Sequence, residues 1–267
     1  MLNKEFILDK KSINKLKSKG ISILELKQLL DDDIDTYLEI WHAQGLNIIK
    51  ERGYYYFETK FMPVDEAVFC IVDIETNGSK IDKHQIIEIG ALKLKGGKVI
   101  DKYESLVKCD EINEHITEIT GISVDDTKDA PSLKDVLYKF KEFLADAVFV
   151  AHDVKFDYTF ISQSLQKIGL EPLLNRTLCS LDLAQRTLTS YRYALSYLDK
   201  TFNLNPDASH HRAMSDVLTT TKLFKMSLEN IDDDIKTVED LITFSKHAKM
   251  KTKPKFDPFL ESEQRVE

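Results

Sequence analysis

The sequence predicts an α/β domain over residues 65–228, preceded by a small α+β module. Two observations support the domain: apolar segments rich in β-branched and aromatic residues alternate with segments whose apolar residues recur at helical spacing. A third observation sets the module apart, because residues 1–62 predict two short helices followed by a hairpin. The chain has 267 residues, 42% of them hydrophobic and 31% charged, which suits one or two domains with a packed core.

The composition excludes several classes of protein. The longest apolar run, residues 67–72, is far shorter than the ~20 residues needed to cross a bilayer, and the first residues lack a signal peptide's apolar segment. We therefore expect a cytoplasmic protein that does not contact a membrane. Cys70, Cys109 and Cys179 are far apart, which argues against disulfides and zinc sites. The net charge of −8 is unusual for a protein that coats nucleic acid, but it leaves room for an acidic pocket that holds metal ions.

Residues 1–62 are predicted to form a winged-helix-like module. Helices are expected at 22–30 and 31–45, with Asp31–Asp33 as an N-cap and Gly45 as the helix end, and a hairpin at 46–58. In a winged helix that reads DNA, the second helix would enter the major groove. Here that helix has five acidic residues and no Lys or Arg, so phosphate would repel it. We favour a packing or protein-docking role over DNA reading.

The predicted α/β domain spans residues 63–230. Its expected elements are a buried strand at 67–73, strands at 86–94 and 99–107 joined by a turn at 95–97, a helix at 133–144, a buried strand at 147–151 and a helix at 156–168. Residues 231–267 are expected to form a tail with one helix at 235–246 and a lysine-rich stretch at 246–255. For this stretch we favour a solvated segment over a weak contact with nucleic acid or a partner.

Two carboxylates stand at the end of the first buried strand. Side chains alternate along a strand, so Asp73 and Glu75 point to one face while Ile74 packs on the other. Neighbouring carboxylates repel each other unless a proton or a cation separates them. The carboxyl end of a central strand is also where α/β sheets place their sites. An Asp-x-Glu pair is common by chance, and its position is what makes this one a candidate site.

Two further groups of candidate residues lie after a strand or at the start of a helix. Asp157 falls in the first turn of the helix after strand 147–151, beside Phe156 on a side expected to be buried, whereas Asp153 is a candidate helix cap. His211 and Asp216 are five residues apart, which on one continuous helix would place them on different faces. If His211 lies in the loop that enters the helix, both side chains can face one cavity.

The three motifs occur along the chain in the order Asp-x-Glu, Asp and His-x4-Asp. With this order the sequence resembles the DEDD exonucleases of ribonuclease H-like fold, which have a mixed central sheet flanked by helices. The resemblance is strongest to the histidine-bearing branch that contains the proofreading epsilon subunit of bacterial DNA polymerase III. It covers roughly residues 66–228 and includes the segments 86–91, 119–123 and 129–131. The sequence departs from the family pattern at Asn77 and Asp153, near the expected nucleotide pocket, which leaves substrate preference open.

The resemblance implies a role for each candidate residue. The metal-binding carboxylates would be Asp73, Glu75, Asp157 and Asp216, holding two divalent ions, Mg²⁺ or Mn²⁺, with His211 as general base. The terminal nucleotide would contact Ile74, Thr76 and Phe156, with Thr120 and His152 as further candidates. A histidine base must be neutral and free imidazole titrates near ~6.5, so we expect activity to need added metal and to fall below about pH 6.5.

The implied activity is metal-dependent 3′–5′ removal of nucleoside 5′-monophosphates from a single-stranded or frayed 3′ end of DNA, in proofreading or repair. One alternative is trimming of RNA 3′ ends, which the same site chemistry allows. Another is a catalytically inert regulator that binds nucleic acid or protein, although the intact acidic set argues against it. A DNA polymerase is a candidate partner, with residues 1–62 and the tail as candidate docking elements.

Overall fold

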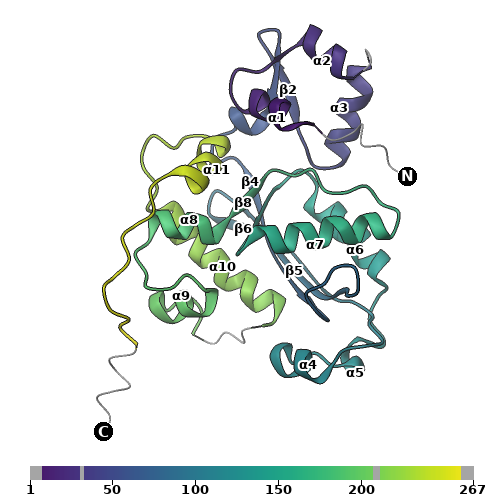
Figure 1. Cartoon of the computed structure of the whole chain (residues 1–267), viewed down its shortest axis with the longest axis vertical. Coiled ribbons are helices and arrows are strands. Elements are labelled where there is room, and N and C mark those ends of the chain that lie inside the picture. Colours follow the sequence, from purple (N-terminus) through teal and green to yellow (C-terminus); the bar gives the residue numbers. More distant parts are fainter. Residues whose placement is uncertain (1–7, 31–32, 207–210, 260–267) are drawn as a thin grey trace.

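The computed structural model describes residues 8–30, 33–206 and 211–259 (Figure 1). It contains an α/β domain built on a five-stranded mixed sheet, with a small module of helices and a three-stranded sheet before it. This arrangement confirms the predicted fold class. Asp31 and Asp32, two of the three residues expected to cap a helix, lie outside the described residues.

The N-terminal module has the element order helix, strand, helix, helix, strand, strand. Its elements are α1 (Lys10–Lys17), β1 (Ile21–Ser22), α2 (Ile23–Leu29), α3 (Ile34–Ala43), β2 (Ile48–Glu51) and β3 (Tyr54–Phe57), with the strands in the order β1-β3-β2. Asp33 caps α3 by accepting a hydrogen bond from the N–H of Thr36, and Gly45 follows the helix in the left-handed conformation. Trp41 and Phe57 are buried at its centre. The sequence did not predict α1, because Ile13 and Leu16 are the only apolar residues of that helix.

The large sheet has the strand order β6-β5-β4-β7-β8. These strands are β4 (Val68–Thr76), β5 (Ile86–Lys95), β6 (Lys98–Leu106), β7 (Val148–Ala151) and β8 (Thr177–Cys179). The central strand β4 pairs antiparallel with β5 and parallel with β7, so the sheet is mixed. Strand β4 continues three residues past its predicted end, which places both Asp73 and Glu75 within the strand.

Helices cover both faces of the sheet. On one face α6 (Leu133–Leu144) and α7 (Val154–Lys167) pack on Val72 and Ile74, and on the other α10 (Ala213–Leu228) packs on Phe69 and Ile71. The remaining helices of the domain are α4 (Glu114–Thr120), α5 (Val124–Thr127), α8 (Ser180–Thr187) and α9 (Leu195–Phe202). By strand alternation, Asp73 therefore faces the α10 side. No helix in the described ranges is long and apolar enough to cross a membrane.

Helix α11 (Val238–His247) connects the module to the domain. It begins three residues later than predicted, behind a capping box formed by Thr237 and Asp240, and buries Leu241 in the core beneath α10. Its Glu239 accepts a hydrogen bond from the Thr59 hydroxyl (3.0 Å) and forms an ion pair with Arg176 (2.6 Å). Helix α11 thus packs on the body of the protein, while the boundaries at residues 62 and 230 stay predictions.

The module sits at the end of β4 that is opposite to the carboxylates. Val68, the first residue of β4, lines a small cavity together with Asn47 and Glu58 of the module region. Glu75 lies seven residues further along the strand, which corresponds to ~23 Å at ~3.3 Å per residue. Figure 1 shows the module stacked on this end of the domain.

Candidate active site

The last residues of β4 carry two of the predicted carboxylates. Asp73 and Glu75 point to the face covered by α10, and the pairing with β5 becomes irregular between Glu75 and Thr76. Gly90 lies opposite Asp73 on β5, and a Cβ there would come within 2.8 Å of the backbone of Ala213. The missing side chain therefore lets the start of α10 approach the sheet directly beside the carboxylates.

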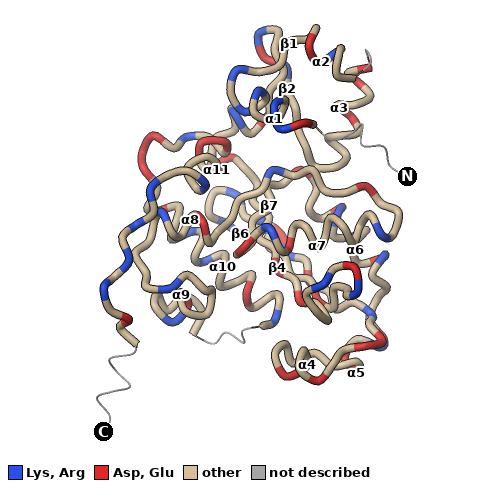
Figure 2. The backbone as a smooth tube through the Cα atoms, viewed as in Figure 1, with Lys and Arg blue, Asp and Glu red and all other residues tan. Residues whose placement is uncertain are grey.

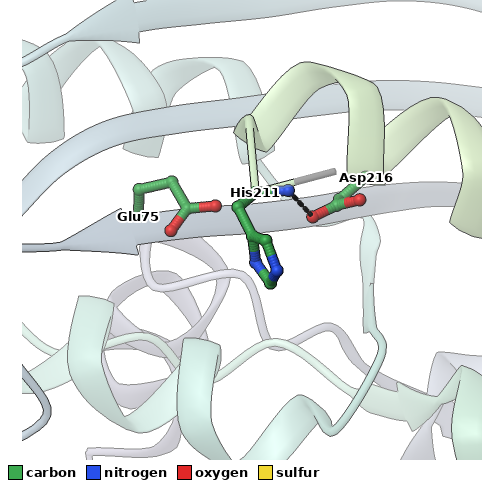
Figure 3. Close-up of side chains that lie close together, drawn as sticks. All are labelled: Glu75, His211 and Asp216. Carbon is green, nitrogen blue, oxygen red and sulfur yellow. Dashed lines mark hydrogen bonds between the residues drawn. The ribbon is translucent and has the colours of Figure 1, made fainter. Parts of the chain in front are cut away.

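The loop before α10 brings the third cluster to the same place. His211 lies in this loop, which meets the condition for sharing a cavity with Asp216. Its backbone is left-handed (φ 64°), and its N–H donates a hydrogen bond of 3.1 Å to Oδ2 of Asp216. Glu75, His211 and Asp216 each offer one ligand atom, and these atoms lie within 4.8 Å of one another. Figure 3 shows the three side chains grouped between the strand and the first turn of α10.

Asp157 approaches from the other side of β4. It lies in the first turn of α7, is buried, and accepts a hydrogen bond of 3.2 Å from the N–H of Ile74. Asp73 is close enough to Asp157, Asp216 and Glu75 for all three charges to act on it. The five residues that the sequence singled out thus gather at the carboxyl end of one strand.

The cluster carries more negative charge than the protein compensates. Burial, followed by the charges of Asp157 and Asp216, raises the pKa of Asp73 well above its usual value. Burial and the charge of Asp216 raise the pKa of Glu75 to about 8, and burial also raises the pKa of Asp157. A pair of hard cations fits this donor set, because Mg²⁺ and Mn²⁺ prefer carboxylate oxygens and would neutralise the repulsion.

The residues predicted to contact a nucleotide differ in accessibility. Phe156 is 40% exposed at the start of α7, Thr76 is half-buried at the end of β4, and Ile74 is buried against α6 and α7. His152 is half-buried, and its Nε2 donates a hydrogen bond of 2.8 Å to the carbonyl of Tyr193. An exposed aromatic ring beside the carboxylates is suited to stacking on a base, so Phe156 is the strongest of these candidates.

The hydrogen bonds of two further candidate residues, Thr120 and Asp153, differ from what the sequence analysis expected. The buried hydroxyl of Thr120 donates to the carbonyl of Ile116 and accepts from the N–H of Ile122, so its bonds close the end of α4. Asp153 occupies the N-cap position of α7, but it is left-handed (φ 72°) and its side chain makes no capping hydrogen bond, so its predicted capping role is wrong. A capping residue typically has extended backbone angles, and the left-handed backbone of Asp153 departs from them.

The family follows from a direct comparison. A family model described as exonuclease (RNase T) matches residues 70–224, more than half of the chain and the whole of the carboxylate cluster. The chain belongs to the DEDD exonucleases. This confirms the resemblance from sequence, and it places the protein in a family of 3′–5′ exonucleases.

Curated relatives of this exonuclease are larger polymerases. The chain is 37% identical over 161 residues to the DNA polymerase III PolC-type of Staphylococcus haemolyticus, which covers 60% of this chain and 11% of the polymerase. It is 37% identical over 179 residues to the corresponding polymerase of Caldanaerobacter subterraneus, covering 66% of this chain and 13% of that one. The chain therefore spans only a small fraction of the curated relatives it matches.

Solved structures confirm the fold. Exonuclease X in complex with 5′ overhanging duplex DNA superposes with a TM-score of 0.52 at 24% identity, covering 66% of this chain and 99% of that chain. Escherichia coli exonuclease I in complex with a dA16 oligonucleotide gives a TM-score of 0.54 at 18% identity, covering 60% of this chain and 41% of that one. At these identities, the similarity is one of fold.

Glu88 is a part of the exonuclease site that the sequence reasoning missed. It is buried on β5, opposite Glu75, where its carboxylate accepts hydrogen bonds from Arg212 Nη2 (2.7 Å) and from the N–H of Ala213 (2.8 Å). These bonds hold the first turn of α10, and with it the loop that carries His211. The available signal was an acidic residue inside an otherwise apolar strand, because a buried charge needs a partner.

Replacing Glu88 by glutamine should therefore weaken both stability and activity. Hydrogen bonds to a charged group contribute about 1.5–3 kcal/mol, and the partial exposure of Arg212 places the expected loss at the low end. We expect a lower Tm and a kcat reduced about tenfold at little-changed KM, because Glu88 positions α10 without touching substrate. Thermal unfolding and steady-state kinetics measure both. The matched control is Glu51→Gln, which removes an exposed pair with Arg52 in the N-terminal module and should change neither; an unchanged Glu88→Gln protein would contradict the positioning role.

Metal should stabilise this exonuclease, and more so at alkaline pH. The raised pKa values of Asp73 and Glu75 mean that the metal-free folded state binds more protons than the unfolded state between about pH 4 and pH 8, so its stability falls as pH rises. Mn²⁺ at 100 times its Kd would add about 2.7 kcal/mol, on the order of 5–10 °C in Tm. We expect Mn²⁺ to raise Tm more at pH 8 than at pH 6, because at pH 6 protons compete with the ion for the carboxylates.

Thermal unfolding with EDTA or Mn²⁺ at the two pH values tests this expectation. A Glu75→Gln variant serves as the internal comparison, since it removes one of the titrating groups and should flatten the dependence of Tm on pH. Equal Mn²⁺ shifts at pH 6 and pH 8 in the wild type would show that the carboxylate cluster does not bind the ion.

Proposed function

We propose that this chain removes nucleoside 5′-monophosphates from DNA 3′ ends by metal-dependent hydrolysis, in replication proofreading or repair. The observation that carries the proposal is the gathering of four carboxylates and one imidazole at the end of β4. The 37% identity to DNA polymerase III PolC-type chains favours a role beside a DNA polymerase, which is the proposed partner.

In this proposal the acidic residues hold the metal and the imidazole moves a proton. Asp73, Glu75, Asp157 and Asp216 would hold two divalent ions. When bound, Mg²⁺ or Mn²⁺ supplies Lewis-acid stabilisation of the charge that builds up on the phosphate and the leaving 3′-oxygen. His211 takes the proton from the attacking water as general base. The N–H of His211 is fixed on Asp216, so this ligand also sets the position of the base.

Neighbouring residues would receive the terminal nucleotide. Phe156, exposed next to Asp157 in the first turn of α7, offers a ring for stacking, Thr76 ends β4 beside Glu75, and the buried Ile74 lies between the two carboxylates of that strand. His152 keeps its Nε2 proton on the Tyr193 carbonyl, and burial lowers the pKa of this imidazole, which favours the neutral form. A single nucleotide must leave the stack to enter, so frayed or single-stranded ends are the preferred substrate.

The test is release of nucleotides from a labelled oligonucleotide with Mg²⁺ or Mn²⁺. We expect a 5′-labelled single strand of DNA to shorten stepwise from its 3′ end, to yield nucleoside 5′-monophosphates and to survive in EDTA. RNA of the same sequence is digested in parallel. If the RNA is digested as fast as the DNA or faster, the proposed preference for DNA is wrong. Wild-type protein that leaves both strands intact would favour an inert binding protein and would overturn the proposal.

A further inference from the structure

The segment that follows α11 is anchored along the surface of the domain. This C-terminal segment, residues 248–259, runs beside α8 and α9 (Figure 1). The N–H of Lys251 donates to the carbonyl of Gln185 (2.8 Å), and the buried Asp257 accepts a hydrogen bond from the Tyr197 hydroxyl (2.7 Å) and pairs with Arg192 (3.5 Å). The segment therefore follows a defined path along the domain, which the sequence did not predict.

The anchored path exposes an uncompensated row of positive charge. Lys249, Lys251, Lys253 and Lys255 are all exposed, and the chain has no acidic residue between His247 and Phe256. Within the described ranges, none of these four ammonium groups forms an ion pair with a carboxylate. Figure 2 shows the blue positions that follow one another along this segment. Such a row, on a protein with a net charge of −8, is suited to a polyanion.

Aromatic side chains lie beside these cations, and of Phe256 and Tyr193 it is Phe256 that is exposed. Phe256 is 72% exposed, and Lys253 lies 5.8 Å from the centre of the Tyr193 ring. Across the path, Arg192 lies 5.9 Å from the Tyr191 ring. Cations that follow a backbone, together with aromatic faces on which any base can stack, are what proteins use to bind single strands without sequence preference.

Tyr193 links the path to the segment that follows β7 and leads into α7. The carbonyl of Tyr193 accepts the hydrogen bond of His152, which lies just after β7 and five residues before Asp157. Tyr193 thus contacts Lys253 of the C-terminal segment with its ring, and with its carbonyl it contacts His152, a candidate for binding the terminal nucleotide.

We propose that the C-terminal segment, with Arg192 on the facing loop, binds the single-stranded DNA that leads to the 3′ end in the site. The inference rests on the proposed function. It adds a binding surface for the rest of the DNA strand, made of the C-terminal segment and Arg192, which we call the track. Phosphates would contact the four lysines, and a base would stack on Phe256. Because the track lies outside the cluster, it should govern KM for long substrates and leave the hydrolysis of a dinucleotide unchanged.

The experiment compares two substrates of the 267-residue chain. A variant with Lys249, Lys251, Lys253 and Lys255 all changed to Gln is expected to raise KM for a 15-nucleotide DNA about tenfold. It should also weaken the salt dependence of log(kcat/KM) by ~0.7 for each phosphate that the variant no longer binds, while kcat/KM for a DNA dinucleotide stays within twofold. The matched control changes Lys11, Lys98, Lys134 and Lys139 to Gln, which removes four exposed charges on α1, β6 and α6 and should leave both substrates unaffected.

Phe256→Ala provides a second, uncharged probe, and we expect it to raise KM for the 15-nucleotide DNA about fivefold. Unchanged KM in both variants would overturn the inference, as would equal losses on the dinucleotide or a loss confined to RNA of the same sequence. Failure of the proposed function looks different, because the wild type would then digest neither the dinucleotide nor the long strand.

Discussion

Replacing Asp73 by asparagine is expected to lower kcat on single-stranded DNA by about 10³-fold. Asparagine keeps the shape of the side chain but removes its charge at the centre of the cluster, where the charges of Asp157, Asp216 and Glu75 converge. Without that charge the site holds its metal less tightly and in an altered position. Nucleotide release at saturating DNA and increasing Mn²⁺ measures the loss, and excess metal should restore only a small part of it.

The same substitution should stabilise the metal-free protein, and this separates the loss of chemistry from misfolding. Burial and like charges destabilise an ionised Asp73, so a neutral amide relieves repulsion and should raise Tm in EDTA at pH 8. Asp101→Asn, on an exposed position of β6, is the matched control and should alter neither activity nor Tm. An Asp73→Asn protein with more than a tenth of the wild-type kcat would remove Asp73 from the metal site.

Replacing His211 by asparagine is expected to reduce kcat by about 10²–10⁴-fold, the range of a general base. Asparagine is preferred over alanine because His211 has a left-handed backbone, which asparagine tolerates, and because the backbone N–H can still donate to Asp216. The metal ligands stay in place, so the Mn²⁺-induced rise in Tm should be retained while the chemical step slows. Single-turnover rates and thermal unfolding together measure this split.

His247→Asn, on the exposed end of α11, is the control for this substitution and should behave as the wild type. A His211→Asn protein that keeps its rate would assign proton transfer to another group. One that loses the metal-induced stabilisation as well would make His211 a part of the metal site rather than a base.

The regular elements around the site could be predicted because their signals are local. Alternation along residues 67–76 places Asp73 and Glu75 on one face, and the helical spacing after Pro131 defines α6. The spacing of His211 and Asp216 allows a shared cavity only if the histidine precedes the helix, and in the structure α10 begins after it, at Ala213. These features depend on neighbours within a few residues.

The features that the sequence did not predict depend on distant or weak signals. The partners of Glu88 are 124 and 125 residues away, so only the folded chain shows why its charge is tolerated. Strand β1 has two residues and β8 has three, too few for a pattern. The C-terminal segment is ordered by Gln185, Arg192 and Tyr197, none of which is near it in sequence.

The placement of the module at the start of β4 has a consequence for how the enzyme can be held. The two ends of β4 are separated by ~23 Å. A partner that binds residues 8–57 would therefore hold the molecule at the end opposite to the carboxylates and leave the carboxylate cluster accessible. A tether on that side would confine the enzyme near a primer terminus at millimolar effective concentration without obstructing access. Tyr197 of α9 anchors the C-terminal segment, so an attachment through α9 would cover the surface that we propose binds the DNA strand.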